Sequence, residues 1–213
     1  MIKVTVWNEY LEELQYEHVA KVYPNGIHEC IREFLEKDPE IQVRCVTLRM
    51  EDQGLSEEIL NDTDVLIWWG HQAHDEVTEE NVQRVKQHVL DGMGLIALHS
   101  AHYSNPMKEL LGTSMCVRWK HGEREKLVCV APSHPIAEGI TEPVILEKEE
   151  MYGEYFDIPK PDDVVFLGWF SNEEEFRSGC TFTRGVRSSI SSRDMKNIRF
   201  IIIHRFRELL PMQ

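Results

Sequence analysis

The segment GMGLIALHSAHYSNPMKELLG, residues 92–112, places a short apolar run directly before a group of polar side chains. Residues 94–98 have the composition of a buried strand, and apolar residues recur at helical spacing after residue 105. The junction between the two holds polar side chains that the packing of a strand does not require: His99, Ser100 and His102. The segment therefore predicts a buried strand, a polar turn and a helix.

The same order of elements recurs earlier in the chain. Apolar and β-branched runs predict strands at residues 2–7, 41–48 and 65–69, and apolar residues at helical spacing predict helices within residues 25–38 and 82–89. Strands that alternate with helices form a parallel sheet between helices, and right-handed crossovers bring the carboxyl ends of the strands to one edge. Ligands of such sheets bind at that edge, so we expect the polar turn to face a ligand.

Past residue 112 the pattern changes to strands separated by turns that contain proline and glycine. Strands are predicted in KLVCVA (residues 126–131), PVILEKEEMYGEYF (residues 143–156) and DVVFLGWF (residues 163–170). We expect them to extend the sheet and to add an antiparallel portion. The predicted fold class is therefore α/β, with a parallel sheet sandwiched by helices and an antiparallel extension.

Length and composition exclude several classes of protein. The chain has 213 residues, 42% of them hydrophobic, which suffices for one compact domain. It has no apolar leader and no apolar run near the roughly 20 residues of a membrane span, so we expect a soluble, cytoplasmic protein without a membrane partner. A net charge of −14 argues against a nucleic acid partner, because phosphate binding needs a basic surface. The five cysteines are irregularly spaced and predict reduced, mostly buried thiols.

The segment WWGHQAHDE, residues 68–76, follows the third predicted strand. Gly70 permits a tight turn, and His71 and His74 come next, with carboxylates beside them. Histidines at this spacing can ligate a metal or act as an acid/base pair. The alternative is a polar loop whose histidines cap the following helix.

Ser100 stands in a strand-to-helix turn, where α/β enzymes expose a nucleophile beside backbone N–H groups. The Gly-x-Ser-x-Gly pattern of such turns is absent, because Leu98 and His102 occupy the flanking positions. Ser100 is therefore either a nucleophile or a hydrogen-bonding or capping residue. His99 or His102 is a predicted site residue in either case.

Two segments of the second half carry further candidates. In APSHPIAEGI, residues 131–140, His134 stands before a proline, either at a site or in a turn that starts a short helical segment. In EKEEMYGEYF, residues 147–156, Glu149 and Glu150 cannot both be buried without partners. One of them either faces the histidines as a ligand or general base, or lies on a solvated strand edge.

Five segments together resemble the ThuA-like (trehalose utilisation) family: VLIWWGHQAHDEV, VLDGMGLIALHSAH, APSHPIAEGI, EEMYGEYFDIP and FRSGCTFTRG. The resemblance runs in order from residue 2 to about residue 185. It implies a fold similar to flavodoxin-like sheets and to class I glutamine amidotransferases. In the amidotransferases a cysteine nucleophile stands in the turn that holds Ser100 here, so glutamine amidotransfer is not expected.

The resemblance also implies action on a sugar, such as a keto derivative of trehalose or of a related disaccharide, by an enzyme of the hydrolase or isomerase type. Carried over to this sequence, the catalytic candidates are His71, His99, Ser100 and Glu150. The candidates for substrate binding are His74, His102, His134 and Tyr152. A divalent metal such as zinc would take His71, His74 and His102 as ligands, although no spacing here is diagnostic. A homodimer or higher homo-oligomer is expected by analogy with the fold alone.

Two other functions remain open. In the first, the same edge holds a sugar without turning it over, as a binding or regulatory module, with aromatic surfaces from Trp68, Trp69, Tyr103 and Tyr152. In the second, the family activity has been lost with an altered C-terminal segment.

That segment, residues 186–213, departs from the family. Family members continue past the TFTRG strand with an aromatic strand, a Gly-His-Glu turn and a closing helix, whereas this chain continues VRSSISSRDMKNIRFIIIHRFRELLPMQ. Permitted codons for this tail, read one base earlier, can yield VFYFFSGHEKHPFYHHPSVSGIIANA, which has those features in family order. We therefore predict a family domain at residues 1–185 and an atypical tail at residues 186–213 that arose by a frameshift.

The frameshift also accounts for the charge of the tail, where six basic residues accompany two acidic ones in an otherwise acidic chain. If the tail is translated as written, residues 198–206 are apolar enough to add an edge strand. The Gly-His-Glu group would then be missing from the site.

Overall fold

Strand β3 (Val65–Trp69) shows why this chain forms a sheet covered on both faces. Side chains alternate between the two faces of a strand. Leu66 and Trp68 pack in one buried cluster with the valines of helix α5 (Glu79–Leu90). Ile67 packs in a second cluster with Ile31 of helix α3 (Ile27–Leu35). A strand that fills two cores needs apolar residues at every position, which explains the continuous run.

The structure is a computed structural model that describes residues 1–172, 175–176, 180–185 and 197–203. Within these residues the main sheet has the strand order β2-β1-β3-β4-β11-β10-β7. Its strands besides β3 are β1 (Ile2–Asn8), β2 (Ile41–Thr47), β4 (Gly94–Leu98), β7 (Asp163–Val164), β10 (Cys180–Gly185) and β11 (Asn197–Ile203). Strands β1 to β4 and β11 run parallel, and β10 pairs antiparallel with both β11 and β7.

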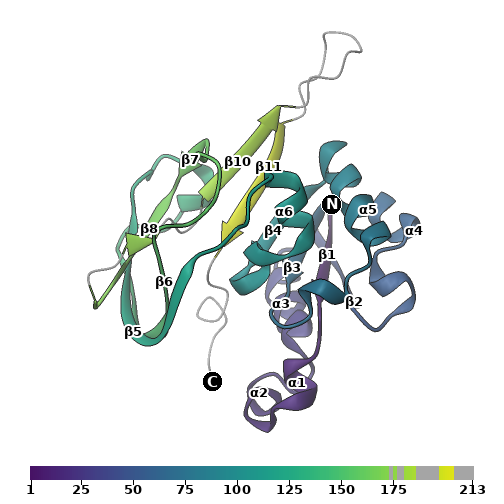
Figure 1. Cartoon of the computed structure of the whole chain (residues 1–213), viewed down its shortest axis with the longest axis horizontal. Helices are drawn as coiled ribbons and strands as arrows, with labels where there is room; N and C mark the ends of the chain where they lie inside the picture. Colours follow the sequence, from purple (N-terminus) through teal and green to yellow (C-terminus); the bar gives the residue numbers. More distant parts are fainter. Residues whose placement is uncertain (173–174, 177–179, 186–196, 204–213) are drawn as a thin grey trace.

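Helices connect the parallel strands and cover the sheet (Figure 1). They are α1 (Glu12–Gln15), α2 (Glu17–Val22), α3, α4 (Glu57–Asn61), α5 and α6 (Asn105–Leu111), with short 3-10 turns η1 (Glu51–Gly54), η2 (His74–Glu76), η3 (His99–Tyr103) and η4 (Pro135–Ala137). The Thr78 side chain accepts a hydrogen bond from the Asn81 N–H and so begins α5. Gly112 ends α6 in the left-handed conformation, at φ 68°.

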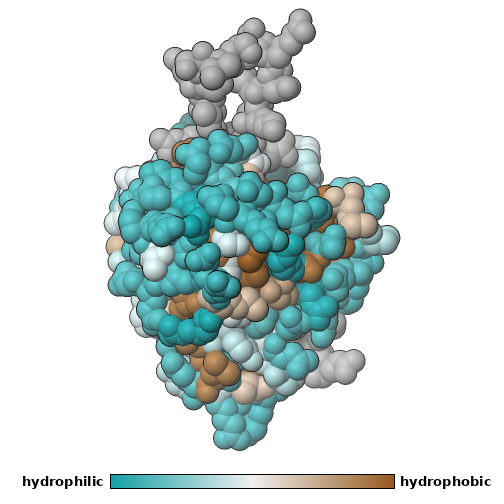
Figure 2. Space-filling view, turned by 90° about the vertical axis from the view of Figure 1, so that its right-hand side faces the viewer, coloured by the Kyte–Doolittle hydropathy of each residue, from teal (hydrophilic) through white to brown (hydrophobic). Residues whose placement is uncertain are grey.

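A second, antiparallel sheet lies beside the end of the main sheet that holds β7 and β10 (Figure 1). Its order is β6-β5-β8-β9, from β6 (Val144–Gly153), β5 (Arg118–Cys129), β8 (Phe166–Phe170) and β9 (Glu175–Phe176). The surface is mostly hydrophilic on the face shown in Figure 2, with small hydrophobic patches between hydrophilic residues. Such a surface agrees with the high content of acidic residues in the sequence.

The α/β fold with an antiparallel extension, predicted from the sequence, is confirmed. Strand β5 is longer than predicted and begins at Arg118 rather than at residue 126. The predicted strand at residues 163–170 is two strands, because β7 joins the main sheet and β8 the second sheet. Strand β11 is internal, between β4 and β10, so the expectation that the tail adds an edge strand is wrong.

Apart from β11, the atypical tail at residues 186–213 lies outside the described residues, as does Cys180 except for its backbone. The other four cysteines are free, but Cys116 is exposed and Cys30, Cys45 and Cys129 are half-buried, so the expectation of buried thiols is wrong. No helix in the described part of the chain is both long and apolar enough to cross a membrane.

Candidate functional site

The carboxyl ends of β1, β3 and β4 meet at one edge of the main sheet. Strand β1 leads into Glu9, β3 into Gly70 and His71, and β4 into His99. Chain connections leave β1 in opposite directions, toward β2 on one side and β3 on the other, which makes this edge the topological switch point of the sheet. Open parallel sheets bind their ligands at such a point.

His99 occupies the turn between β4 and η3 in a left-handed conformation, at φ 53°. Residues other than glycine adopt this conformation at a cost, and such residues gather at functional sites. The His99 ring stacks on Trp69 at 5.0 Å between ring centres and on His71 at 5.1 Å. The strained position, which holds the nucleophile in strand-to-helix elbows, therefore holds an imidazole here, and Ser100 is one residue beyond it.

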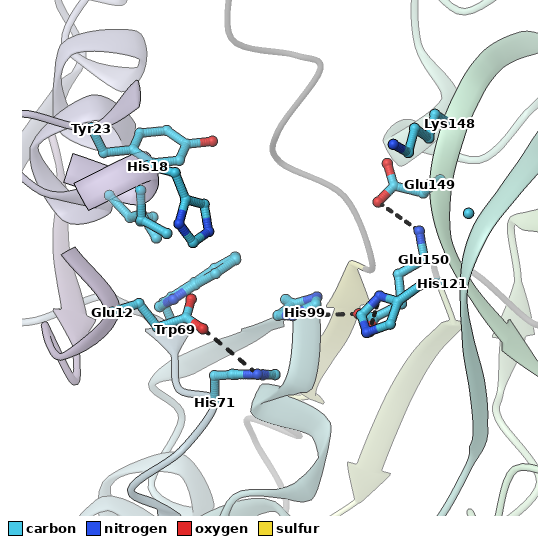
Figure 3. A pocket seen from close by; sticks show the side chains of 13 residues that line it. Glu12, His18, Tyr23, Trp69, His71, His99, His121, Lys148, Glu149 and Glu150 are labelled. Carbon is cyan, nitrogen blue, oxygen red and sulfur yellow. Dashed lines mark hydrogen bonds and ion pairs between the residues drawn. The ribbon is translucent and has the colours of Figure 1, made fainter. Parts of the chain in front are cut away.

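The carboxylate of Glu150 lies at the centre of a polar cluster (Figure 3). Its oxygens lie 3.6 Å from His99 Nε2 and 3.4 Å from His121 Nδ1. The hydroxyl of Tyr152 donates to the same carboxylate at 3.1 Å. Glu150 is thus the half-buried carboxylate that faces the histidines, as the sequence predicted for one of the pair, while Glu149 lines the cavity beside it.

The pairing of β5 with β6 assembles one wall of this cluster. Trp119 pairs with Tyr152, and His121 pairs with Glu150. Residues two apart on a strand share a face, so the four side chains lie on the same face of the second sheet. A bulge follows His121 at Gly122, whose φ of 86° suits glycine, and bulges of this kind re-aim side chains next to active sites.

Ser100 joins this wall to the main sheet. Its hydroxyl is hydrogen-bonded to His71 Nδ1 at 2.7 Å and to the Tyr152 hydroxyl at 3.3 Å. His71 Nε2 lies 3.7 Å from a carboxylate oxygen of Glu12. A continuous polar chain therefore runs from Glu12 through His71, Ser100 and Tyr152 to Glu150. Burial, together with the charge of Glu150, raises the pKa of Tyr152, so its hydroxyl stays protonated and available as a donor.

Glu9 fixes the loop that carries His71. Its buried carboxylate accepts hydrogen bonds from the backbone N–H of Gln72 at 2.9 Å and of Ala73 at 3.0 Å. These are the two residues that follow His71, so Glu9 sets the course of the chain at that point. The alternative of a helix-capping role for these histidines is wrong, because Thr78 caps α5.

His74 and His102 lie behind the cluster as neutral rings. Burial lowers the pKa of His102 to about 4, and its Nδ1–H donates to the carbonyl of Met115 at 2.9 Å. Burial also lowers the pKa of His74, whose buried Nδ1 atom has no hydrogen-bond partner among the described residues. Both side chains can therefore meet a neutral ligand without adding charge.

Two cavities flank the cluster. The first has a volume of about 560 Å³ and lies between the α1–α2 segment, with Glu12, His18 and Tyr23, and the β5–β6 hairpin (Figure 3). Its floor consists of Trp69, His71 and His99. The second has a volume of about 510 Å³ and lies along Ser100, His102 and Tyr152. Both volumes suit small organic ligands.

A metal has no complete ligand set in the described part of the chain, where no three His, Cys, Asp or Glu side chains form a group that could hold an ion. The predicted ligands His71, His74 and His102 are therefore not gathered into one group in this arrangement.

The structure brings most of the predicted residues together. His71, His99, Ser100, Glu150 and Tyr152 form the cluster, and His74 and His102 line the second cavity. His134 lines neither cavity; its side chain accepts the N–H of Ile136 and caps η4, which is the structural alternative for that segment.

Sequence reasoning missed several residues that line the cavities, among them Glu12, His18, Tyr23, Trp119 and His121. Alternation in VRWKHGE, residues 117–123, offers a signal for two of them, because Trp119 and His121 alternate there with basic residues. The α1–α2 segment offers no such signal, since both helices are shorter than two turns.

The chain matches a sequence model of a family described as trehalose utilisation, ThuA, over residues 3–185. Among solved structures, a ThuA-like protein from Parabacteroides merdae has a TM-score of 0.63 at 14% identity, covering 95% of this chain and 78% of that one. A protein described as cytoplasmic, from Salmonella typhimurium, has a TM-score of 0.57 at 12% identity, covering 95% and 87%.

A glutamine amidotransferase from Thermotoga maritima has a TM-score of 0.51 at 10% identity, covering 95% of this chain and 74% of that one. At these identities the solved structures show a shared fold and nothing more specific. No curated protein matches the chain.

Proposed function

Because the chain belongs to the ThuA family, described as serving trehalose utilisation, we propose that it acts on a sugar of that kind in the cytoplasm. The substrate is a disaccharide such as trehalose, or its keto derivative, and the chemistry is acid/base catalysis by the cluster around Glu150. The acidic surface charge agrees with a small neutral ligand rather than a nucleic acid.

One observation carries this proposal: Glu150 has two imidazoles and a phenol around its carboxylate at the boundary of both cavities. A carboxylate in this setting can take a proton, and an adjacent imidazolium can give one. The cluster thus offers both partners of general acid/base catalysis within one site.

For a keto sugar, the step that fits is isomerisation. Glu150 takes the proton from the carbon next to the carbonyl, and His99 as imidazolium protonates the carbonyl oxygen, which gives an enediol. Glu150 then gives its proton to the former carbonyl carbon, and His99 takes the proton from the hydroxyl of the carbon that was first deprotonated. The carbonyl thereby moves to that carbon, with no oxidant or reductant consumed. Hydrolysis of a glycosidic bond is the alternative use of the same acid and base.

Glutamine amidotransfer is not part of the proposal. Its thiolate nucleophile has no counterpart at the β4–η3 turn, which holds His99 and Ser100. The chemistry available at this turn is that of an imidazole and a hydroxyl.

The test is turnover of trehalose and of its keto derivative, followed by NMR of the sugar carbons in wild type and in Glu150→Gln. We expect turnover of one of these sugars and a loss of about 10²–10⁴-fold in kcat in the variant, as for removal of a general base. Glu147→Gln is the matched control, because Glu147 lies on the same strand and lines neither cavity. Full turnover by Glu150→Gln would refute the acid/base assignment.

The aromatic floor of the first cavity supports a second candidate, a sugar-binding or regulatory module. Trp69 lines that cavity and Tyr103 the second, whereas Trp68 stacks on Trp7 in the core and is not available to a ligand. Binding of trehalose by wild type and by Glu150→Gln with no turnover by either would favour the module. Binding without turnover would also agree with a family member that has been inactivated by its altered tail. A copy with the restored reading frame distinguishes the two, because only an inactivated enzyme would regain turnover.

A further inference from the structure

The two cavities meet at a shared wall. His71, His121 and Glu150 line both of them. His99 and Trp69 line the first cavity alone, whereas Ser100 and Tyr152 line the second alone. The proposed reacting groups thus stand between two spaces of nearly equal size, about 560 and 510 Å³.

The second cavity offers an aromatic surface. Trp119 lines it with 61% of its surface exposed, which is unusual for the largest apolar side chain. Tyr103 lines it as well and is 41% exposed. Exposed aromatic faces provide broad apolar contact for ligands whose rings have a C–H face.

Polar groups surround these aromatic side chains. Gln72 and Asp75 line the cavity from the loop after β3, and both are directional hydrogen-bond partners. His74 and His102 line it as neutral rings, because burial lowers the pKa of both imidazoles. Aromatic surfaces combined with neutral imidazoles and with acceptors such as Asp75 suit a neutral ring rich in hydroxyl groups.

We propose that the second cavity is a subsite for the second ring of a two-ring sugar, with Trp119 as its stacking surface. The first ring occupies the cavity between α2 and the β5–β6 hairpin, and the bond between the rings passes Glu150. This inference rests on the proposed function and adds to it the place of each ring and the preference for two rings over one.

The experiment compares a two-ring sugar with a one-ring sugar. Dissociation constants of trehalose and of methyl α-glucoside are measured by calorimetry for wild type, for Trp119→Ala and for Trp169→Ala. Trp169 is the matched control, because it is a second exposed tryptophan of the same sheet, on β8, and lines neither cavity. Thermal unfolding of each variant verifies that the fold is retained.

Trehalose is expected to bind wild type at least tenfold more tightly than methyl α-glucoside. Trp119→Ala should weaken trehalose binding about tenfold and leave methyl α-glucoside within twofold, and Trp169→Ala should change neither. Equal binding of the two sugars by wild type, or equal weakening of both by Trp119→Ala, would overturn the subsite and leave the proposed function standing. Binding of neither sugar by wild type would refute the proposed function itself, and the subsite with it.

Discussion

The hydroxyl of Tyr152 donates a hydrogen bond to the carboxylate of Glu150, two residues before it on the same face of β6. The same hydroxyl lies 3.3 Å from Ser100, which is bonded to His71. Tyr152 therefore links the second sheet to the loop after β3 and orients the carboxylate that we propose as the base.

Tyr152→Phe removes this link and keeps the ring. A hydrogen bond to a charged group contributes about 1.5–3 kcal/mol, so we expect kcat to fall by roughly 10–100-fold with a smaller change in KM. The pH dependence of kcat should also change, because the polar chain that joins His71 to Glu150 is interrupted. A shift in thermal stability with unchanged kcat and pH profile would assign Tyr152 to the fold alone.

Ser100→Ala separates the two interpretations of Ser100. If Ser100 only links His71 to Tyr152, the substitution should reduce kcat by no more than about 100-fold, the scale of one hydrogen bond to a charged partner. If Ser100 is a nucleophile, the substitution should abolish both activity and the covalent intermediate. Single-turnover measurements with mass spectrometry distinguish these outcomes, and trapping of a sugar adduct on Ser100 would contradict our assignment.

Glu9→Gln tests the support of the His71 loop. The amide retains one acceptor oxygen where the carboxylate accepts from Gln72 and Ala73, so we expect a loss of about 1–3 kcal/mol in the free energy of unfolding. Glu17→Gln is the control, because Glu17 forms an exposed ion pair with Lys21 and should change stability by less than about 0.5 kcal/mol on the usual scale of such pairs. Equal denaturation midpoints for the two variants would contradict the role of Glu9.

His102 should make the fold sensitive to acid. Its pKa is lowered to about 4 in the folded state, so the unfolded chain, with a pKa near about 6.5, binds the proton more readily. The contribution of the neutral ring is fully present above the unfolded pKa and is lost as the pH falls through the window between the two values. From the difference of the two pKa values we expect a loss of roughly 3 kcal/mol between about pH 6.5 and 4.

The measurement is the free energy of unfolding by urea at several pH values. His102→Asn should flatten the slope within that window, because the variant carries no titrating ring at this position. The variant is expected to be less stable than wild type at neutral pH, so the slope rather than the absolute stability decides. An unchanged slope would contradict the assignment.

The frameshift is tested by the encoding DNA. Codons of the tail that yield VFYFFSGHEKHPFYHHPSVSGIIANA when read one base earlier would support it, and codons that cannot yield this string would refute it.

Metal content is tested by elemental analysis of this chain and of a copy with the restored frame. We expect no stoichiometric metal in this chain, whose described residues form no three-ligand group. Stoichiometric metal in this chain would contradict that expectation.

The fold was predictable where local patterns decide the structure. Apolar runs such as residues 65–69 and the valines of α5 identify strands and helices because each face of an element repeats within a few residues. The order of those elements also places His71 and His99 at one edge of the sheet. The predictions failed where pairing between distant segments decides, as for β11, whose internal place depends on β4 and β10.

The site was predictable to the same extent. Residues that directly follow a parallel strand, such as His71 and Ser100, could be placed at the binding edge because the carboxyl ends of parallel strands lie there. His121 and Trp119 reach the site through the register of β5 on β6, which no local pattern encodes. Glu12 reaches it from a helix of four residues, too short for any periodicity.

At His99, the residue that suits the left-handed backbone best is not the residue that the proposed site needs. Glycine adopts that conformation without steric cost, so His99→Gly would relieve the backbone strain of the turn. It would also remove the ring that stacks on Trp69 and faces Glu150. Selection of this protein for heat resistance alone would therefore favour replacement of His99, and the site would lose this ring.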